Sequence, residues 1–149
     1  MYLVDTDVIS AGAPSKGAAA AALARWMDEN SNGLYLSAVT IAEIADGIAK
    51  ARREGARRKA ARLDEWLETL LHLYSERVLP FDVPAARIAG RLSDQARAKG
   101  HTPGFADLAI AATAAARRFT VLTGNVRHFA PLGVAVHNPF EALPGQDGR

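Results

Sequence analysis

The first ten residues, Met1 to Ser10, read MYLVDTDVIS, and this stretch guides the interpretation of the whole chain. Its apolar pair, Leu3-Val4, is typical of a buried strand and delivers Asp5 and Asp7 to the point where that strand would end. Two neighbouring carboxylates in such a place are costly unless their charge is offset. The stretch fits the acid pair of a phosphate-transferring enzyme, a metal site or a simple turn.

Short apolar, β-prone runs alternate along the chain with longer segments of helical periodicity. Strands separated by helices imply parallel pairing and an α/β sandwich. The segment at 108–115 is apolar nearly all round and predicts a central helix, and the segment at 63–74 carries one apolar helical face. Pro80 makes the third of five expected strands the least secure; the five are residues 2–4, 34–36, 78–81, 120–123 and 134–136.

The length of 149 residues predicts one domain, which we place at residues 1–143, followed by a frayed tail at 144–149. The chain has no cysteine, which excludes disulfides and zinc–thiolate sites and fits a reducing cytosol. We find no signal-peptide pattern, and the alanine-rich run at 18–24 is too short to span a bilayer. We therefore expect a cytoplasmic protein without a membrane partner. The net charge of +2 is only weakly in favour of a nucleic-acid partner.

Four polar residues are expected at one edge of the sheet, because ligands bind beyond the carboxyl ends of parallel strands. Asp5 follows the first strand directly, and Asn125 follows the fourth. Glu43 and Asp107 each lie in the expected first turn of a helix. Each residue also has an ordinary structural explanation. Asp5 fits a helix cap, Thr40 with Glu43 fits a capping box, Asp107 complements a helix dipole and Asn125 suits a turn.

Three carboxylates gathered at one place repel one another unless one takes up a proton or a cation joins them. Oxygen ligands without sulfur suit a hard cation, Mg²⁺ or Mn²⁺. Such an ion polarises a phosphoryl oxygen and lowers the pKa of a bound water. The conjunction of these residues therefore predicts a site that cuts phosphodiester bonds.

Four segments together resemble the PIN-domain ribonucleases: LVDTDVIS at 3–10, LSAVTIAEI at 36–44, ADLAIAATA at 106–114 and VLTGNVRHF at 121–129. The likeness is greatest to the toxin half of VapBC-type toxin–antitoxin pairs, including the FitB-like branch. RVLPFD at 77–82 and VHNPF at 136–140 are also similar to that branch. The resemblance extends from Met1 to about Phe140, which is nearly the whole chain.

This resemblance implies a single-domain, three-layer α/β/α sandwich with a mostly parallel five-stranded sheet. It also implies an endoribonuclease that depends on Mg²⁺ or Mn²⁺ and cuts RNA in the cytoplasm of a bacterium or archaeon. The implied partners are a second copy of the chain, in a homodimer, and a small antitoxin that binds a groove on the toxin.

Residue by residue, Asp5, Glu43 and Asp107 match the three acids of the family. The resemblance implies that Asp5 and Asp107 bind the metal ion. It also implies that Glu43 holds a metal-bound water or a second ion. Thr6 and Thr123 match hydroxyl positions that border the site.

Two residues depart from the family pattern. Asn125 stands where many members carry a fourth acid, which puts a second metal ion in doubt, and we expect it to orient a water or a substrate oxygen. Asp7 stands where asparagine is common. We interpret Asp7 as a cap of the following turn, with partial replacement of the missing charge as the alternative.

The stretch KARREGARRKAAR at 50–62 contains seven basic residues and one acid. A solvated helix pair and a surface for RNA phosphates or a partner both remain open. The residues that would make such contacts are Arg52, Arg53, Arg57, Arg58 and Lys59. The apolar face around Trp66 is expected to be core, with part of it available as a dimer or antitoxin groove. Arg127 and His128 follow Asn125 closely enough to approach a phosphate, but we interpret both as surface residues.

The sequence also allows two other functions. The first is a non-catalytic module of the same fold that binds RNA or the antitoxin, which the missing fourth acid allows. The second is a phosphatase of the haloacid-dehalogenase type, in which Asp5 and Asp7 would be nucleophile and acid. That reading needs a helical lysine and a late acidic motif, but Lys99 lies next to Gly100 and the junction after the fourth strand is Thr-Gly-Asn.

Overall fold

The computed structural model describes residues 1–11 and 19–145, so most of the expected tail lies outside the described residues. Five strands form one sheet in the order β3-β2-β1-β4-β5, and every neighbouring pair is parallel. The expected five-stranded sheet is thereby confirmed. The strands are β1 (Tyr2–Val4), β2 (Leu34–Ser37), β3 (Val78–Leu79), β4 (Thr120–Leu122) and β5 (Val136–His137).

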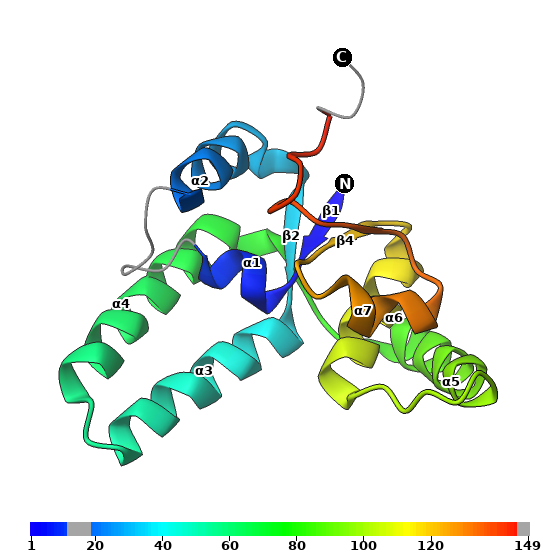
Figure 1. Cartoon of the computed structure of the whole chain (residues 1–149). Helices are drawn as coiled ribbons and strands as arrows, with labels where there is room; N and C mark the ends of the chain where they lie inside the picture. The colour runs from blue at the N-terminus through cyan, green and yellow to red at the C-terminus, as the bar shows by residue number, and fades with distance from the viewer. Residues whose placement is uncertain (12–18, 146–149) are drawn as a thin grey trace.

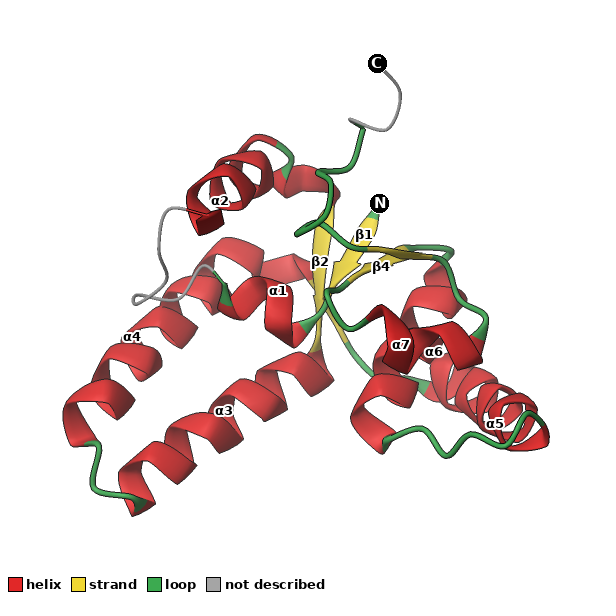
Figure 2. Cartoon of the chain, viewed as in Figure 1, coloured by secondary structure: helices red, strands yellow, loops and turns green. Residues whose placement is uncertain are grey.

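Helices cover both faces of this sheet, which gives the expected three-layer α/β/α sandwich (Figure 1). One layer holds α1 (Thr6–Ser10), α2 (Ala19–Glu29), α3 (Ala38–Arg53) and α4 (Arg57–Tyr74). The other holds α5 (Val83–Ala98), α6 (Phe105–Arg117) and α7 (Val126–Phe129). Short 3-10 turns precede three of the strands: Ser31–Gly33 comes before β2, Ser75–Arg77 before β3 and Ala130–Leu132 before β5. Figure 2 shows how α3 and α4 run together away from the narrow sheet as an arm.

Successive residues of the central strand face opposite layers, as the pleat requires. Leu3 packs into the core between the sheet and α5–α6, whereas Val4 packs into the core against α1–α4. Both side chains are fully buried, so the strand is apolar on both faces, which is typical of a parallel sheet covered by helices. The central helix predicted at 108–115 is confirmed, since the α6 residues from Ala109 to Ala114 are all buried.

The two outermost strands differ from the expectation in length or position. β3 ends at Leu79, because Pro80 has no N–H to donate to a ladder. β5 begins at Val136 rather than 134, since Val136 is the residue that pairs with Val121 of β4. In the described ranges, no helix combines the length and apolar character needed to cross a membrane.

The register of the sheet determines which residues meet at its carboxyl edge. Val4 pairs with Leu36 on one side and with Leu122 on the other. The residues that follow these three paired positions therefore leave the sheet side by side at its carboxyl edge. This edge faces downward in Figure 1, where α1 and α3 begin.

Candidate active site

Asp5 is the buried centre of the site and lies directly after β1, with its residue 4% exposed. Its Oδ1 accepts a hydrogen bond from the backbone N–H of Thr6 at 2.8 Å, so Asp5 does cap the short helix α1. Its Oδ2 accepts from the hydroxyl of Thr123 at 2.8 Å, across the β1–β4 junction. The helix-cap explanation of Asp5 is therefore confirmed, and its role in an active site stays a prediction.

Burial is the main cause that raises the pKa of the Asp5 carboxyl from its ordinary 3.8 to about 6. The hydrogen bonds from Thr123 and Thr6 act in the opposite direction, because they stabilise the charged form. The negative charges of Asp7 and Asp107 raise the pKa further, by smaller amounts. Asp5 is thus a carboxylate whose charge is poorly compensated by the protein alone.

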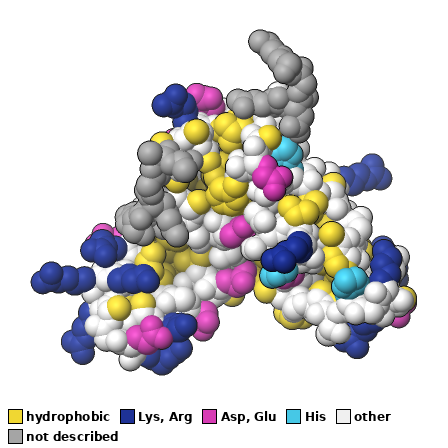
Figure 3. Space-filling view, in the orientation of Figure 1, with side chains coloured by type: hydrophobic (Ala, Val, Ile, Leu, Met, Phe, Trp, Pro, Cys, Tyr) yellow, Lys and Arg dark blue, Asp and Glu magenta, His cyan; other side chains and the backbone are white. Residues whose placement is uncertain are grey.

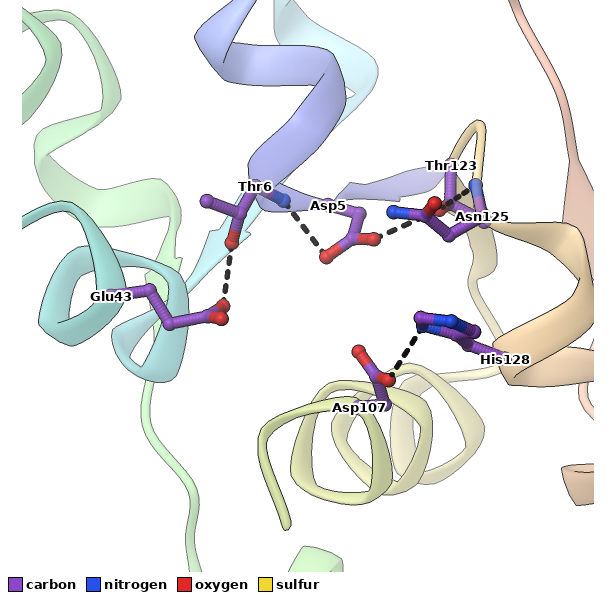
Figure 4. Close-up of polar contacts among 7 residues, drawn as sticks. All are labelled: Asp5, Thr6, Glu43, Asp107, Thr123, Asn125 and His128. Carbon is purple, nitrogen blue, oxygen red and sulfur yellow. Dashed lines mark hydrogen bonds and ion pairs between the residues drawn. The ribbon is translucent and has the colours of Figure 1, made fainter. Parts of the chain in front are cut away.

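Glu43 reaches the site from α3 and is held by Thr6. The Thr6 hydroxyl donates to Glu43 Oε1 at 2.6 Å, which ties the second acid to the residue that follows the first. Figure 4 shows the two carboxylates of Asp5 and Glu43 on either side of Thr6. The hydroxyls of Thr6 and Thr123, two residues expected to border the site, each donate to one of its acids.

The capping-box explanation of Glu43 is wrong. The N-cap of α3 is Ser37, whose hydroxyl accepts from the N–H of Val39 at 3.1 Å. The helix begins earlier than expected, so Thr40 lies inside it, and the Thr40 hydroxyl is buried without a hydrogen-bond partner. Glu43 is consequently in the second turn, and its carboxylate points toward Asp5 rather than back to a cap.

Asp107 lies in the first turn of α6, as expected, and contacts a residue that the sequence reading left on the surface. Its Oδ2 lies 3.1 Å from Nδ1 of His128, which comes from α7. His128 is a surface residue, as expected, with its side chain 58% exposed, and the contact with Asp107 adds to that interpretation. A sequence signal existed, because His128 follows Asn125 by three residues and such residues share one helix face.

Asn125 is the N-cap residue of α7, and its side chain is exposed beside the Asp5–Thr123 pair (Figure 4). Its backbone N–H donates to the Thr123 hydroxyl oxygen at 3.0 Å. Thr123 therefore accepts from Asn125 and donates to Asp5, which links the loop after β4 to the centre of the site.

Asp7 has a different role from the cap that the sequence suggested. Its Oδ2 accepts from the backbone N–H of Gly124 at 2.8 Å, so it joins α1 to the loop after β4. Its Oδ1 is buried without a hydrogen-bond partner. Gly124 is a glycine because an added Cβ would lie 2.8 Å from Asp7 Oδ2 and 2.9 Å from the ring of Phe140. Neither contact could be read from sequence spacing.

The three acids face one opening but do not close into a ligand cluster. In the part of the chain that the structure describes, no three His, Asp or Glu side chains lie close enough together to hold a metal ion. Like charges repel, and the protein holds two of the carboxylates apart, since Glu43 bonds Thr6 and Asp107 contacts His128.

The donor set nevertheless fits a hard cation. Asp5, Glu43 and Asp107 offer carboxylate oxygens only, and these point into a shared opening from three different elements (Figure 4). A cation would supply the compensation that Asp5 lacks, because positive charge lowers the pKa of a buried acid.

The basic stretch at 50–62 is split between the end of α3 and the start of α4. Arg52 forms an ion pair with Asp64 at 2.7 Å, and Lys50 lies 3.9 Å from Glu54. Arg53, Arg57, Arg58 and Lys59 are exposed at the tip of the arm. The structure thus contains the solvated helix pair, and a contact with RNA or a partner stays a prediction.

Comparison with known proteins agrees with this architecture. The family model of the PIN domain matches residues 2–132. The chain belongs to the PIN-domain family.

Two curated relatives narrow this assignment. VapC ribonuclease Y4jK from Sinorhizobium fredii is 39% identical, with 95% of this chain and 99% of that protein covered. Toxin FitB from Neisseria gonorrhoeae is 37% identical, with 94% and 99% covered. The crystal structure of FitAcB from the same organism superposes with a TM-score of 0.81 at 37% identity, covering 94% of this chain and 99% of that one. Within the family, the chain groups with the VapC/FitB-type ribonuclease toxins of type II toxin–antitoxin systems.

This assignment replaces the phosphatase reading of Asp5 and Asp7. The PIN-domain ribonucleases are generally metal-dependent, in keeping with the donor set described above.

Proposed function

We propose that this chain is an endoribonuclease that uses Mg²⁺ or Mn²⁺ to hydrolyse RNA phosphodiester bonds in the bacterial cytoplasm. The observation that carries the proposal is the hydrogen-bonded chain from Thr123 through Asp5 and Thr6 to Glu43, with Asp107 facing it across the opening (Figure 4). These hydrogen bonds hold acids from separate parts of the fold in fixed positions, which is what a hydrolytic site requires.

In this proposal Asp5 and Asp107 hold the cation, and Glu43 holds a water or a second ion. The bound ion would polarise a phosphoryl oxygen and lower the pKa of a water. Thr6 and Thr123 orient the first two acids, because each hydroxyl bonds a carboxylate oxygen that would otherwise rotate. Asn125 would orient a metal-bound water or a substrate oxygen. Hydrolysis in this manner leaves a 5′-phosphate and a 3′-hydroxyl.

A cleavage assay on purified protein, free of any partner, tests the proposal. Wild type should cut RNA in Mg²⁺ and stop in EDTA, and Asp5→Asn or Asp107→Asn should reduce the rate by about 100-fold or more. Asp94→Asn, on the exposed surface of α5, is the matched control and should keep full activity. Full activity of either site variant, or cleavage that persists in EDTA, would contradict the metal mechanism.

A second function, a non-catalytic module that binds RNA or the antitoxin, is favoured by one observation. Asn125 supplies an uncharged amide beside the Asp5–Thr123 pair, where the resemblance to the family implies an acid in many members, so the site has less negative charge to hold cations. The same assay separates the two functions, because a non-catalytic module would bind RNA without releasing new 5′-phosphate ends.

We also propose an antitoxin partner and a homodimer, since the chain groups with the toxin half of two-component systems. An apolar hollow of about 340 Å³ lies between α2 and α4 and includes Met27, Trp66, Leu70 and Leu73 among its lining residues. Leu73 is 59% exposed, which leaves an apolar contact available to a partner. An amphipathic antitoxin helix fits such a groove. Light scattering on the isolated toxin would test the dimer.

A further inference from the structure

Two surfaces could hold the RNA strand beside the acids, and they differ in charge. The first is the arm formed by α3 and α4. The second is a hollow of about 380 Å³ between the start of α6 and α7, lined by His101, Thr102, Pro103, Gly104, Asp107, Arg127, His128 and Pro131. Figure 3 shows basic and histidine side chains gathered over α7 next to acidic ones, and a second group of basic side chains over the arm.

The arm is poorly suited to a phosphate backbone close to the acids. Its own hollow is lined by two arginines, Arg52 and Arg57, but by three acids, Asp64, Glu65 and Glu68. Asp46 follows Glu43 by three residues and therefore shares its helix face. Lys50 also shares this face, but Glu54 lies only 3.9 Å from its amine. The path that leads along α3 from Glu43 thus carries little free positive charge.

The hollow at α7 differs from the arm because its arginine is not offset by acids. Arg127 is exposed, and among the residues that the structure describes it forms no ion pair with a carboxylate. Asp107 is the one acid among the residues lining this hollow, and it already contacts His128. Because Asp107 belongs to both the hollow and the acidic site, a strand held here passes directly to the acids.

We propose that this hollow binds a backbone phosphate of the RNA strand next to the bond that is cut, with Arg127 as its main charged contact. The inference rests on the proposed ribonuclease function and adds the path of the substrate. Arg127 is a substrate-binding residue here, and His101 and His128 supply ring nitrogens at the walls of the hollow. Contacts of this kind determine affinity and position rather than base preference.

The test measures binding of a short fluorescent single-stranded RNA by anisotropy in EDTA. We expect Arg127→Gln to weaken binding about tenfold and to reduce the salt slope of log K by about 0.7, the value for one lost phosphate contact on a single strand. Arg127→Lys should keep the wild-type slope. Arg25→Gln, which removes an exposed arginine from α2, is the charge-matched control and should bind like wild type. Thermal unfolding should show that all variants are folded.

The inference is overturned if Arg127→Gln binds like wild type. It is also overturned if the double variant Arg57→Gln/Arg58→Gln at the arm loses more affinity than Arg127→Gln. The proposed nuclease function fails separately, if wild type binds RNA through Arg127 but produces no cleavage in Mg²⁺. Cleavage by wild type together with unchanged binding of Arg127→Gln overturns the inference alone.

Discussion

Asp7 and Gly124 lie 117 residues apart in the chain, yet Asp7 Oδ2 accepts a hydrogen bond from the Gly124 N–H at 2.8 Å. This contact joins the helix after β1 to the loop after β4, and the same loop carries Thr123 and Asn125. The ring of Phe140, like Asp7 Oδ2, occupies the space that a side chain at position 124 would need. The geometry of the acidic site therefore depends on a position where no side chain fits.

Gly124→Ala should destabilise the protein by about 1 to 3 kcal/mol, because the new methyl group would overlap Asp7 and Phe140. The shifted loop should also reduce RNA cleavage. Chemical denaturation measures the first effect and the cleavage assay the second. Gly47→Ala, in the interior of α3 with open space around it, is the control and should stabilise by about 0.5 to 1 kcal/mol. Equal stability of Gly124→Ala and wild type would show that the loop moves freely.

Asp5→Asn should stabilise the metal-free protein at neutral pH while it abolishes cleavage. The folded pKa of Asp5, about 6, exceeds its ordinary 3.8, so the folded state binds more protons in that window and stability falls as pH rises through it. At pH 7.5 the asparagine should therefore gain up to about 3 kcal/mol.

The measurement is unfolding in EDTA at pH 4 and at pH 7.5. The difference between the variant and wild type should be large at the higher pH and small at the lower one. A difference that grows toward acid pH would show that the charge of Asp5 is stabilised rather than strained in the fold.

Thr6→Val should lower the cleavage rate by about 10- to 100-fold, because it removes the hydroxyl that holds Glu43 Oε1 at 2.6 Å. The backbone N–H that bonds Asp5 remains, so the fold should be intact. Thr6→Ser restores the hydroxyl and should recover most of the activity. If the serine variant is as inactive as the valine variant, the hydroxyl is not what matters at this position.

Asn125→Asp should tighten binding of Mn²⁺, measured by calorimetry, because it adds a negative charge beside the Asp5–Thr123 pair. Gln95→Glu adds the same charge on the exposed face of α5 and should leave the affinity unchanged. An identical affinity for Asn125→Asp and wild type would place residue 125 outside the reach of the ion.

Leu73→Glu should weaken the complex with the antitoxin, expected from an adjoining reading frame, by about tenfold or more, because it places a charge in an apolar groove. RNA cleavage by the isolated toxin should not change. Val83→Glu alters another exposed apolar residue, on α5, and serves as the control. Co-purification of the two chains measures the effect, and undiminished co-purification of Leu73→Glu would move the antitoxin site elsewhere.

Local sequence was sufficient for the architecture. The runs predicted at 2–4, 34–36 and 120–123 are strands to within one residue at their ends, and the helices between them impose parallel order, because periodicity and propensity act over a few residues. The same logic predicted that Asp5, Glu43 and Asp107 would leave the sheet at one edge. The local rules also misplaced the start of α3, since Ser37 and Thr40 are both capable caps and only packing selects between them.

The contacts within the site were decided by the tertiary structure alone. Whether Glu43 meets Thr6, whether Asp107 meets His128 and whether Asp7 meets Gly124 depends on strand register and helix rotation to within about an ångström. Those quantities follow from the packing of two whole layers against the sheet. The sequence by itself therefore determined which groups reach the carboxyl edge, and the folded packing decided which of them hold one another there.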